Sequence, residues 1–206
     1  MEPTESSKLY QRRLAESGIP HRFRGRMLAD YEVETDAQKM VLDAARAYVS
    51  DFPSHSKAGR GLVMLGAVGT GKTMLACAIL QERIRAMSDH VFGLAYAYTT
   101  AAELNSRITA TWRAGSQYTE QQVLDEFRTV RLLVIDDVGA QAGTAVEQAN
   151  LQRVIDARYA DQSATVLVSN LTLAELEAYL GARAMDRLKE TSHVLVFEWA
   201  SRRGTQ

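Results

Sequence analysis

The segment GAVGTGKT at residues 66–73 matches the pattern G-x-x-x-x-G-K-[ST] at every fixed position. An apolar run at residues 62–65 precedes it, and an apolar helical pattern starts at Lys72. In such a loop the glycines let the backbone amides turn inward, and the helix adds its positive end and its free N–H groups. The pattern predicts a strand, a phosphate-binding loop and a helix, in that order. A chance glycine-rich turn is the alternative, and the apolar run and the helical pattern on either side argue against it.

The predicted loop has polar residues with distinct expected roles. Lys72 can reach the β- and γ-phosphate oxygens of a nucleotide, and the Thr73 hydroxyl can ligate Mg²⁺. The expected cofactors are therefore ATP and Mg²⁺. The residues expected to bind ATP are Gly66, Ala67, Val68, Gly69, Thr70, Gly71, Lys72, Thr73 and Met74.

A second apolar run, LLVI at residues 132–135, ends in two aspartates. A buried parallel strand delivers such side chains at its C-terminal end, where ligands of these sheets bind. Asp136 is expected to hold Mg²⁺, and Asp137 to orient or deprotonate an attacking water. An apolar strand that ends in Asp is common on its own. Its position after a phosphate-binding loop favours the functional interpretation.

Short apolar runs alternate with helical patterns along the chain. The runs cover residues 62–65, 91–98, 132–135, 165–168 and 194–197. The helical patterns cover residues 37–52, 72–88, 101–112, a segment opened by the capping box Thr119-x-x-Gln122, the region of residues 151–159, and residues 173–189. Continuous apolar strands separated by helices are typical of a parallel sheet covered on both faces. We expect a doubly wound α/β domain, a three-layer sandwich around a five-stranded parallel sheet.

Composition excludes several other classes of protein. The net charge of −1 means that any nucleic-acid binding has to be local. The single cysteine, Cys77, rules out an intrachain disulfide, suits a reducing cytosol and reads as a core residue. The histidines lack the spacing of zinc ligands. The N-terminus is polar, and no apolar stretch approaches the ~18 residues that would span a bilayer, so we expect a cytoplasmic protein with no membrane contact.

Five further segments accompany the two nucleotide motifs. They are SGIPHRF, ADYEVE, LVSN, LGARAMDRL and FEWASRR, in this order. With these segments the chain resembles the AAA+ ATPases of the DnaC/DnaI helicase-loader group, to which the IstB transposition helpers are close relatives. The resemblance spans residues 17–203, and the last two segments are its most specific part. It implies an AAA+ P-loop NTPase domain at residues 21–206 with no separate helical lid, after a short basic arm at residues 1–20.

The resemblance also implies roles for residues outside the two nucleotide motifs. Asn170 falls in the sensor-1 slot, where an amide contacts the γ-phosphate or the water. Arg187 falls on the arginine-finger position, which reaches a neighbouring subunit's nucleotide, and Arg183 lies one helical turn earlier and would assist it. Arg203 falls near the sensor-2-like arginine and is counted with the ATP-binding residues. Without the order of the motifs along the chain, each of these arginines would be interpreted as a solvent-exposed charge with no role in the site.

Two positions leave alternatives open, and a third departs from the usual residue of the family. In the resembling loaders an aromatic residue at the position of Trp112 faces single-stranded DNA, and the adjacent Arg113 would contact the DNA phosphates. The alternative is that Trp112 anchors its helix to the core. Tyr31 either covers the adenine or packs near it. Asp137 stands where most AAA+ proteins carry Glu, which implies slow hydrolysis.

The implied function is that of a replicative helicase loader. The partners would be a hexameric replicative helicase, single-stranded DNA and further copies of the chain in a nucleotide-dependent spiral. Only residues 1–20 could replace the N-terminal domain with which such loaders grip the helicase, so the contact falls there or on the basic segment 8–26. Two alternatives are an IstB-like transposition helper and a nucleotide-dependent adaptor that hardly hydrolyses ATP.

Overall fold

A computed structural model describes residues 5–87, 95–140 and 143–202. Within these ranges five strands form one sheet in the order β2-β3-β4-β1-β5, and every strand pairing is parallel. The strands are β1 (Gly61–Gly66), β2 (Tyr96–Thr100), β3 (Leu132–Val138), β4 (Ala164–Ser169) and β5 (Ser192–Phe197). The prediction of a five-stranded parallel sheet is confirmed.

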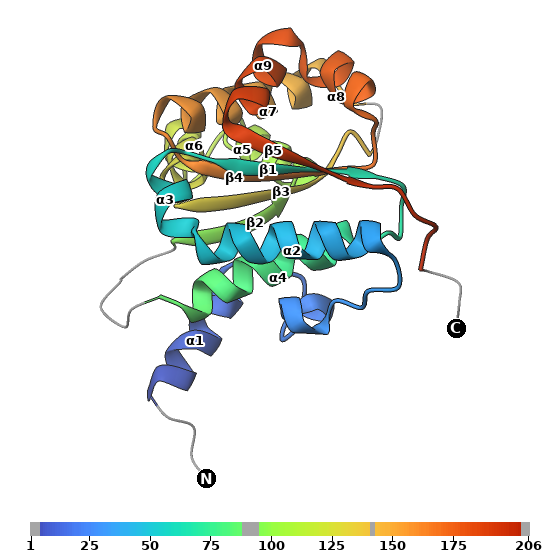
Figure 1. The fold of residues 1–206 in the computed structure, drawn as a ribbon. Helices are drawn as coiled ribbons and strands as arrows, with labels where there is room; N and C mark the ends of the chain where they lie inside the picture. The colour runs from blue at the N-terminus through green and yellow to red at the C-terminus, as the bar shows by residue number, and fades with distance from the viewer. Residues whose placement is uncertain (1–4, 88–94, 141–142, 203–206) are drawn as a thin grey trace.

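Helices cover both faces of the sheet (Figure 1). One face carries α2 (Asp36–Ser50) and α4 (Lys72–Arg85), and α3 (Phe52–Lys57) follows α2. The other face carries α5 (Ala101–Ala110), α6 (Glu120–Thr129), α7 (Ala145–Ala160), α8 (Leu173–Leu180) and α9 (Ala182–Thr191). The three-layer sandwich is therefore as predicted.

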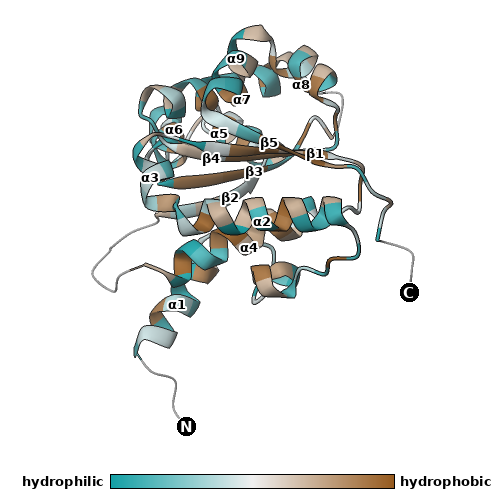
Figure 2. Cartoon of the chain, viewed as in Figure 1, coloured by the Kyte–Doolittle hydropathy of each residue, from teal (hydrophilic) through white to brown (hydrophobic). Residues whose placement is uncertain are grey.

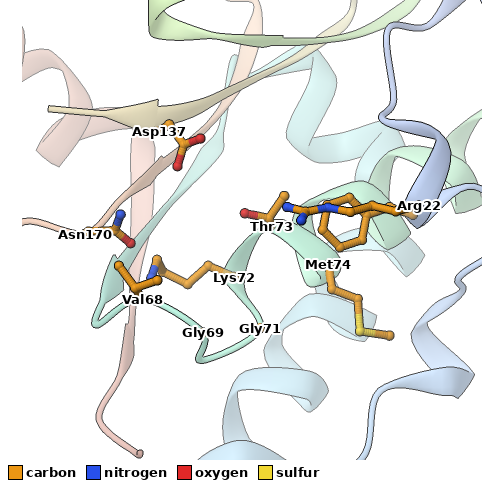
Figure 3. A pocket seen from close by; sticks show the side chains of 10 residues that line it. Arg22, Val68, Gly69, Gly71, Lys72, Thr73, Met74, Asp137 and Asn170 are labelled. Carbon is orange, nitrogen blue, oxygen red and sulfur yellow. The ribbon is translucent and has the colours of Figure 1, made fainter. Parts of the chain in front are cut away.

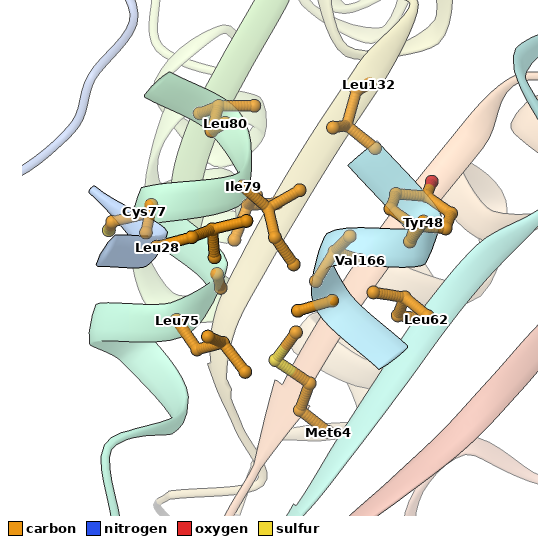
Figure 4. Close-up of a cluster of buried hydrophobic side chains, with 14 of the residues drawn as sticks. Leu28, Tyr48, Leu62, Met64, Leu75, Cys77, Ile79, Leu80, Leu132 and Val166 are labelled. Carbon is orange, nitrogen blue, oxygen red and sulfur yellow. The ribbon is translucent and has the colours of Figure 1, made fainter. Parts of the chain in front are cut away.

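Two buried clusters lie between the layers, one on each face of the sheet. Strand side chains alternate between them, so that Leu62 and Met64 point to the α2/α4 side and Val63 and Leu65 to the opposite side. The interior strands β1, β3 and β4 are accordingly largely apolar (Figure 2). Figure 4 shows the first cluster, in which Cys77 is fully buried among aliphatic side chains, as expected of a core residue.

An N-terminal helix, α1 (Glu5–Glu16), packs against α4 and was not predicted. The adjacent Arg12 and Arg13 obscure the apolar pattern, yet Leu14 and the following Ile19 are buried. The amide of Tyr98 donates a hydrogen bond of 2.7 Å to the carbonyl of Ser17. This contact lies on the edge of β2 that no strand of the described chain pairs with. The functional division at residue 20 stays a prediction.

Several element boundaries differ from the prediction. The single helix expected over residues 173–189 is wrong, because Gly181 (φ 77°, ψ 156°) separates α8 from α9. The helix expected over residues 37–52 ends at Ser50, and α3 begins at Phe52 with Pro53 in its first turn. Helices α4 and α5 end at Arg85 and Ala110, earlier than expected. The strand expected over residues 91–98 is β2, which extends to Thr100, and residues 91–94 of that prediction lie outside the described residues.

A buried arginine joins the elements on the α7 side of the sheet. Arg158 of α7 is 1% exposed and donates to a side-chain oxygen and to several backbone carbonyls. These acceptors are Thr165 Oγ1 and the carbonyl oxygens of Phe127, Arg128, Val130 and Ala164. Burial lowers the pKa of this guanidinium, and the carbonyl acceptors favour its charged form. In the part of the chain described here, no helix has the length and apolar character needed to cross a membrane.

Candidate nucleotide site

A cavity of about 230 Å³ lies at the C-terminal edge of the sheet, beside the β1–α4 loop and the ends of β3 and β4 (Figure 3). It is lined by Arg22, Phe23, Val68, Gly69, Gly71, Lys72, Thr73, Met74, Asp137 and Asn170. Eight of these ten residues were predicted as site residues from the sequence. Of the other predicted loop residues, Gly66 and Ala67 border a neighbouring groove beside β5.

The loop adopts the glycine-dependent conformation that its sequence predicts. Gly69 (φ 83°) and Gly71 (φ 97°) have left-handed backbone torsions that residues with a Cβ rarely adopt. The ammonium of Lys72 lies at the base of the loop, 2.6 Å from the carbonyl oxygen of Gly66 and 2.7 Å from that of Ala67. The hydroxyl of Thr70 also bonds the Ala67 carbonyl, at 2.9 Å. The helix start and the lysine together place positive charge on the cavity.

The two aspartates at the end of β3 point in different directions. Asp137 has a left-handed backbone (φ 55°), and the β3–β4 register shifts between Ile135 and Val138. This bulge turns the exposed Asp137 carboxylate into the cavity. Asp136 is 1% exposed and does not line the cavity.

Both oxygens of the Asp136 carboxylate have a hydrogen-bond donor. Tyr98 Oη of β2 donates to Oδ2 at 2.7 Å, and the amide of Asp137 donates to Oδ1 at 2.8 Å. Burial, followed by the charge of Asp136, raises the pKa of Tyr98, so the hydroxyl keeps its proton and remains a donor. From the sequence, Tyr98 was only the last residue of the apolar run expected to form a strand over residues 91–98. The hydroxyl on an otherwise buried strand, adjacent to a strand that ends in Asp, was the available signal.

Asn170 follows β4 directly and faces the cavity together with Asp137 (Figure 3). The end of β4 is fixed by Ser169, whose hydroxyl donates to the Val138 carbonyl at 2.6 Å and accepts from the Leu171 amide at 3.1 Å. The structure therefore brings the predicted Asn170, Asp137 and Lys72 to one cavity.

The two predicted arginines of α9 are not part of this cavity. Arg187 forms an ion pair with Asp156 of α7 and lies over the ring of Tyr159, with 5.2 Å from Cζ to the ring centroid. The Arg183 Nε lies 3.6 Å from the same Asp156 carboxylate. Their side chains are 19% and 78% exposed, respectively. A role for Arg187 in a neighbouring subunit's site stays a prediction.

The C-terminal segment and Tyr31 hold the phosphate-binding loop from outside the cavity. Trp199 Nε1 donates to the Thr70 carbonyl at 2.9 Å, and the Arg202 amide donates to the Gly69 carbonyl at 3.0 Å. Tyr31 is 4% exposed, and its hydroxyl lies 3.4 Å from the Thr70 carbonyl. Tyr31 therefore packs against the loop and does not line the cavity. Arg203 lies outside the described residues.

Trp112 lies on the protein surface after α5, with 57% of the residue exposed. Its indole N–H donates to Glu120, and Glu120 pairs with Arg153 at 2.6 Å. The adjacent Arg113 is also exposed. This exposure contradicts the reading of Trp112 as a core anchor, and DNA contact stays a prediction.

Two cavity residues, Arg22 and Phe23, were not predicted as site residues. Both belong to the SGIPHRF segment and form the short helix η1 (His21–Phe23). The segment precedes the first strand by many residues, so spacing alone does not connect it with the loop. The presence of this Arg-Phe pair in one of the segments that carry the family resemblance was the signal that could have indicated it.

The sheet order β2-β3-β4-β1-β5, with a phosphate-binding loop after the interior strand β1 and an acidic end to β3, defines an α/β P-loop NTPase fold of the AAA+ type. Comparison with known families agrees, since the IstB-like ATP binding proteins match residues 10–206. The chain therefore belongs to the family of IstB-like ATP binding proteins.

Two similar relatives are named as replicative helicase loaders. The chain is similar to DnaC of Buchnera aphidicola subsp. Acyrthosiphon pisum, with 31% identity over 194 residues that cover 94% of this chain and 75% of the relative. It is 30% identical to DnaC of Escherichia coli K12, with the same two coverages of 94% and 75%. The resemblance to the DnaC group is confirmed.

Solved structures show the same fold. A crystal structure of the DnaC helicase loader matches with a TM-score of 0.74 at 23% identity, covering 87% of this chain and 100% of the other. A structure of DnaI matches with a TM-score of 0.70 at 23% identity, covering 86% and 93%. DnaA bound to AMPPCP and single-stranded DNA matches with a TM-score of 0.69 at 17% identity, covering 88% and 51%.

Proposed function

We propose that the protein is an ATP- and Mg²⁺-dependent ATPase that helps to load a replicative helicase during DNA replication. The observation that carries the proposal is a single cavity in which Lys72, Asp137 and Asn170 meet, in a chain that is 30% identical to a helicase loader over 94% of its length. A cytoplasmic location is part of this proposal, and the relatives named as replicative helicase loaders support it.

The residues present fit a magnesium ion. Mg²⁺ prefers hard oxygen ligands, and the hydroxyl of Thr73 and the carboxylate of Asp136 are of this kind. Two donors hold Asp136 in a fixed orientation behind the cavity. When bound, the ion would neutralise charge that develops on the phosphates.

Residues of the chain would bind the phosphates and activate the attacking water. Lys72 would exchange its loop carbonyl contacts for β- and γ-phosphate oxygens, and the loop amides would hold the phosphates. Asp137, turned into the cavity by its left-handed backbone, would orient or deprotonate the attacking water. Asn170 would bond the γ-phosphate or that water. Because Asp137 is a methylene shorter than Glu, turnover would be slow, as suits a switch.

Assembly would complete the site. In a nucleotide-dependent spiral, Arg187 would leave Asp156 and reach the phosphates of the adjacent copy, with Arg183 assisting. Trp112 would stack on bases of single-stranded DNA, and Arg113 would meet its phosphates. The exposure of Trp112 and its position on a surface loop support this part of the proposal.

The test is to mix the protein with its host's hexameric replicative helicase, with and without ATP, and to measure complex mass by light scattering. We expect a complex whose formation depends on ATP in the native protein and is lost in Lys72→Ala, because the lysine is the main cation of the phosphate site. No complex in either state would contradict the loader function and favour an IstB-like transposition helper or a binding adaptor. Tight ATP binding by Lys72→Ala would contradict the assigned phosphate site.

A further inference from the structure

The cavity has a second positively charged side chain that none of the nucleotide motifs supplies. Arg22 of η1 lines it, and Figure 3 shows its side chain extending toward Thr73, on the side away from Asp137 and Asn170. Its guanidinium lies 4.4 Å from the centroid of the Phe23 ring, and Phe23 lines the same cavity.

No carboxylate in the described ranges forms an ion pair with Arg22, although the residue is exposed. The nearby arginines differ. Arg202 lies 4.0 Å from the carboxylates of Glu32 and of Glu34, and Arg24 donates to the Ile19 carbonyl at 3.0 Å. Arg22 therefore adds positive charge to a cavity in which Asp137 is the acidic lining residue.

The backbone that carries Arg22 is fixed by the phosphate-binding helix itself. Gln81 of α4 is fully buried, and its side-chain amide donates to the carbonyls of Phe23 and Arg26 at 3.0 and 2.8 Å. The Gln81 side-chain oxygen accepts from the Gly25 amide at 2.7 Å. The helix that begins with Lys72 thus also holds the backbone of the segment that carries Arg22.

We propose that Arg22 is a nucleotide-binding residue that contacts the α- and β-phosphates, an inference that rests on the ATP site of the proposed function. Asp137 and Asn170 occupy the side of the cavity assigned to the γ-phosphate. Arg22 lies on the opposite side with Thr73 and Met74, where the chain of phosphates continues toward the ribose. A planar guanidinium matches two phosphate oxygens, and the Phe23 ring supports it from one face.

This position has a consequence that separates Arg22 from the residues at the γ-phosphate. ADP and ATP share the α- and β-phosphates, so removal of Arg22 weakens both nucleotides by the same factor. Loss of a residue that reads the γ-phosphate, such as Asn170, weakens ATP alone. One guanidinium-to-phosphate contact is worth about tenfold in affinity.

The experiment measures ATP and ADP affinity with Mg²⁺ by isothermal titration calorimetry, using the native chain, Arg22→Ala, Arg22→Lys and Arg24→Ala. We expect the alanine variant to lose about tenfold for both nucleotides and the lysine variant to lose less. Arg24→Ala is the matched control, since Arg24 is two residues away, is bonded to a backbone carbonyl and does not line the cavity. It keeps native affinity.

Two results overturn the inference. One is native affinity of Arg22→Ala for both nucleotides, and the other is a loss for ATP alone, which would place Arg22 at the γ-phosphate. Should the alanine variant fail to fold in a thermal scan, Arg22→Met keeps an unbranched side chain over Phe23 without the charge, and the same criteria apply. A native chain that binds neither nucleotide would refute the ATP site itself, whereas native binding with an unaffected Arg22→Ala refutes only the role of Arg22.

Discussion

Deleting a single oxygen atom, the hydroxyl oxygen of Tyr98, removes the hydrogen bond from Tyr98 to Asp136. Tyr98→Phe keeps the ring in the first hydrophobic cluster and deletes the hydroxyl that lies 2.7 Å from Asp136 Oδ2. The carboxylate is 1% exposed, so water has little access to replace the lost donor. Asp136 would keep the Asp137 amide as its remaining donor among the hydrogen bonds described.

The expected cost follows from the charge and burial of the acceptor. A hydrogen bond to a charged group contributes about 1.5–3 kcal/mol, and the loss leaves a buried carboxylate oxygen without its partner. We therefore expect Tyr98→Phe to lower the free energy of unfolding by about 2 kcal/mol. For a chain of this size about 1 kcal/mol corresponds to about 2–4 °C, so the Tm should fall by about 4–8 °C.

The assay is urea and thermal unfolding at neutral pH, with Tyr96→Phe as the matched control. Tyr96 lies on the same strand and is 3% exposed, and in the described residues its hydroxyl forms no hydrogen bond, so its removal should change stability by less than about 0.5 kcal/mol. An equal loss in both variants would refute the reasoning, because it would assign the effect to packing. A Tyr98→Phe variant as stable as the native chain would refute it as well.

Two further predictions concern buried polar groups. Arg158→Ala should lower the free energy of unfolding by more than about 4 kcal/mol, because the buried carbonyls of Phe127, Val130 and Ala164 lose their donor. Urea unfolding of the variant and the native protein measures this difference. A loss under about 1 kcal/mol would contradict the prediction. Burial raises the pKa of Tyr31 to about 12, above the value of about 10 in the unfolded chain. The protonated hydroxyl of Tyr31 therefore contributes fully to stability below about pH 10, and this contribution is lost as the pH rises toward 12. Tyrosinate absorbance of the native and the urea-unfolded chain would measure this shift, and coincident titrations would argue against it.

The sequence was most informative where local pattern and chemistry coincide. The phosphate-binding loop needs a strand before it and a helix after it, and the apolar runs around Val63 and Val134 are buried on both faces, so the sheet followed from the pattern. Asp137 lies near the end of β3, Asn170 directly follows the adjacent parallel strand β4, and such ends meet at one edge. The predicted eight cavity residues therefore lie together.

What the sequence missed depends on contacts between distant segments. The position of Arg22 depends on Gln81, which lies more than fifty residues later and is fully buried. The ion pair of Arg187 with Asp156 depends on the turn at Gly181, where a continuous helical pattern hides a left-handed glycine. The hydrophobic periodicity of one helix or strand does not predict such contacts, because they depend on how different helices and strands pack against each other.

Tyr98 is held at both of its polar ends. Its amide is bonded to Ser17, which follows α1, and its hydroxyl is bonded to Asp136 beside the nucleotide cavity. One residue, through its backbone amide and its side-chain hydroxyl, therefore connects the N-terminal segment to the site by two hydrogen bonds. A partner that pulls residues 17–19 from the edge of β2 works directly against the orientation of Asp136, and a ligand that tightens Asp136 resists that pull to the same extent, since such coupling is reciprocal.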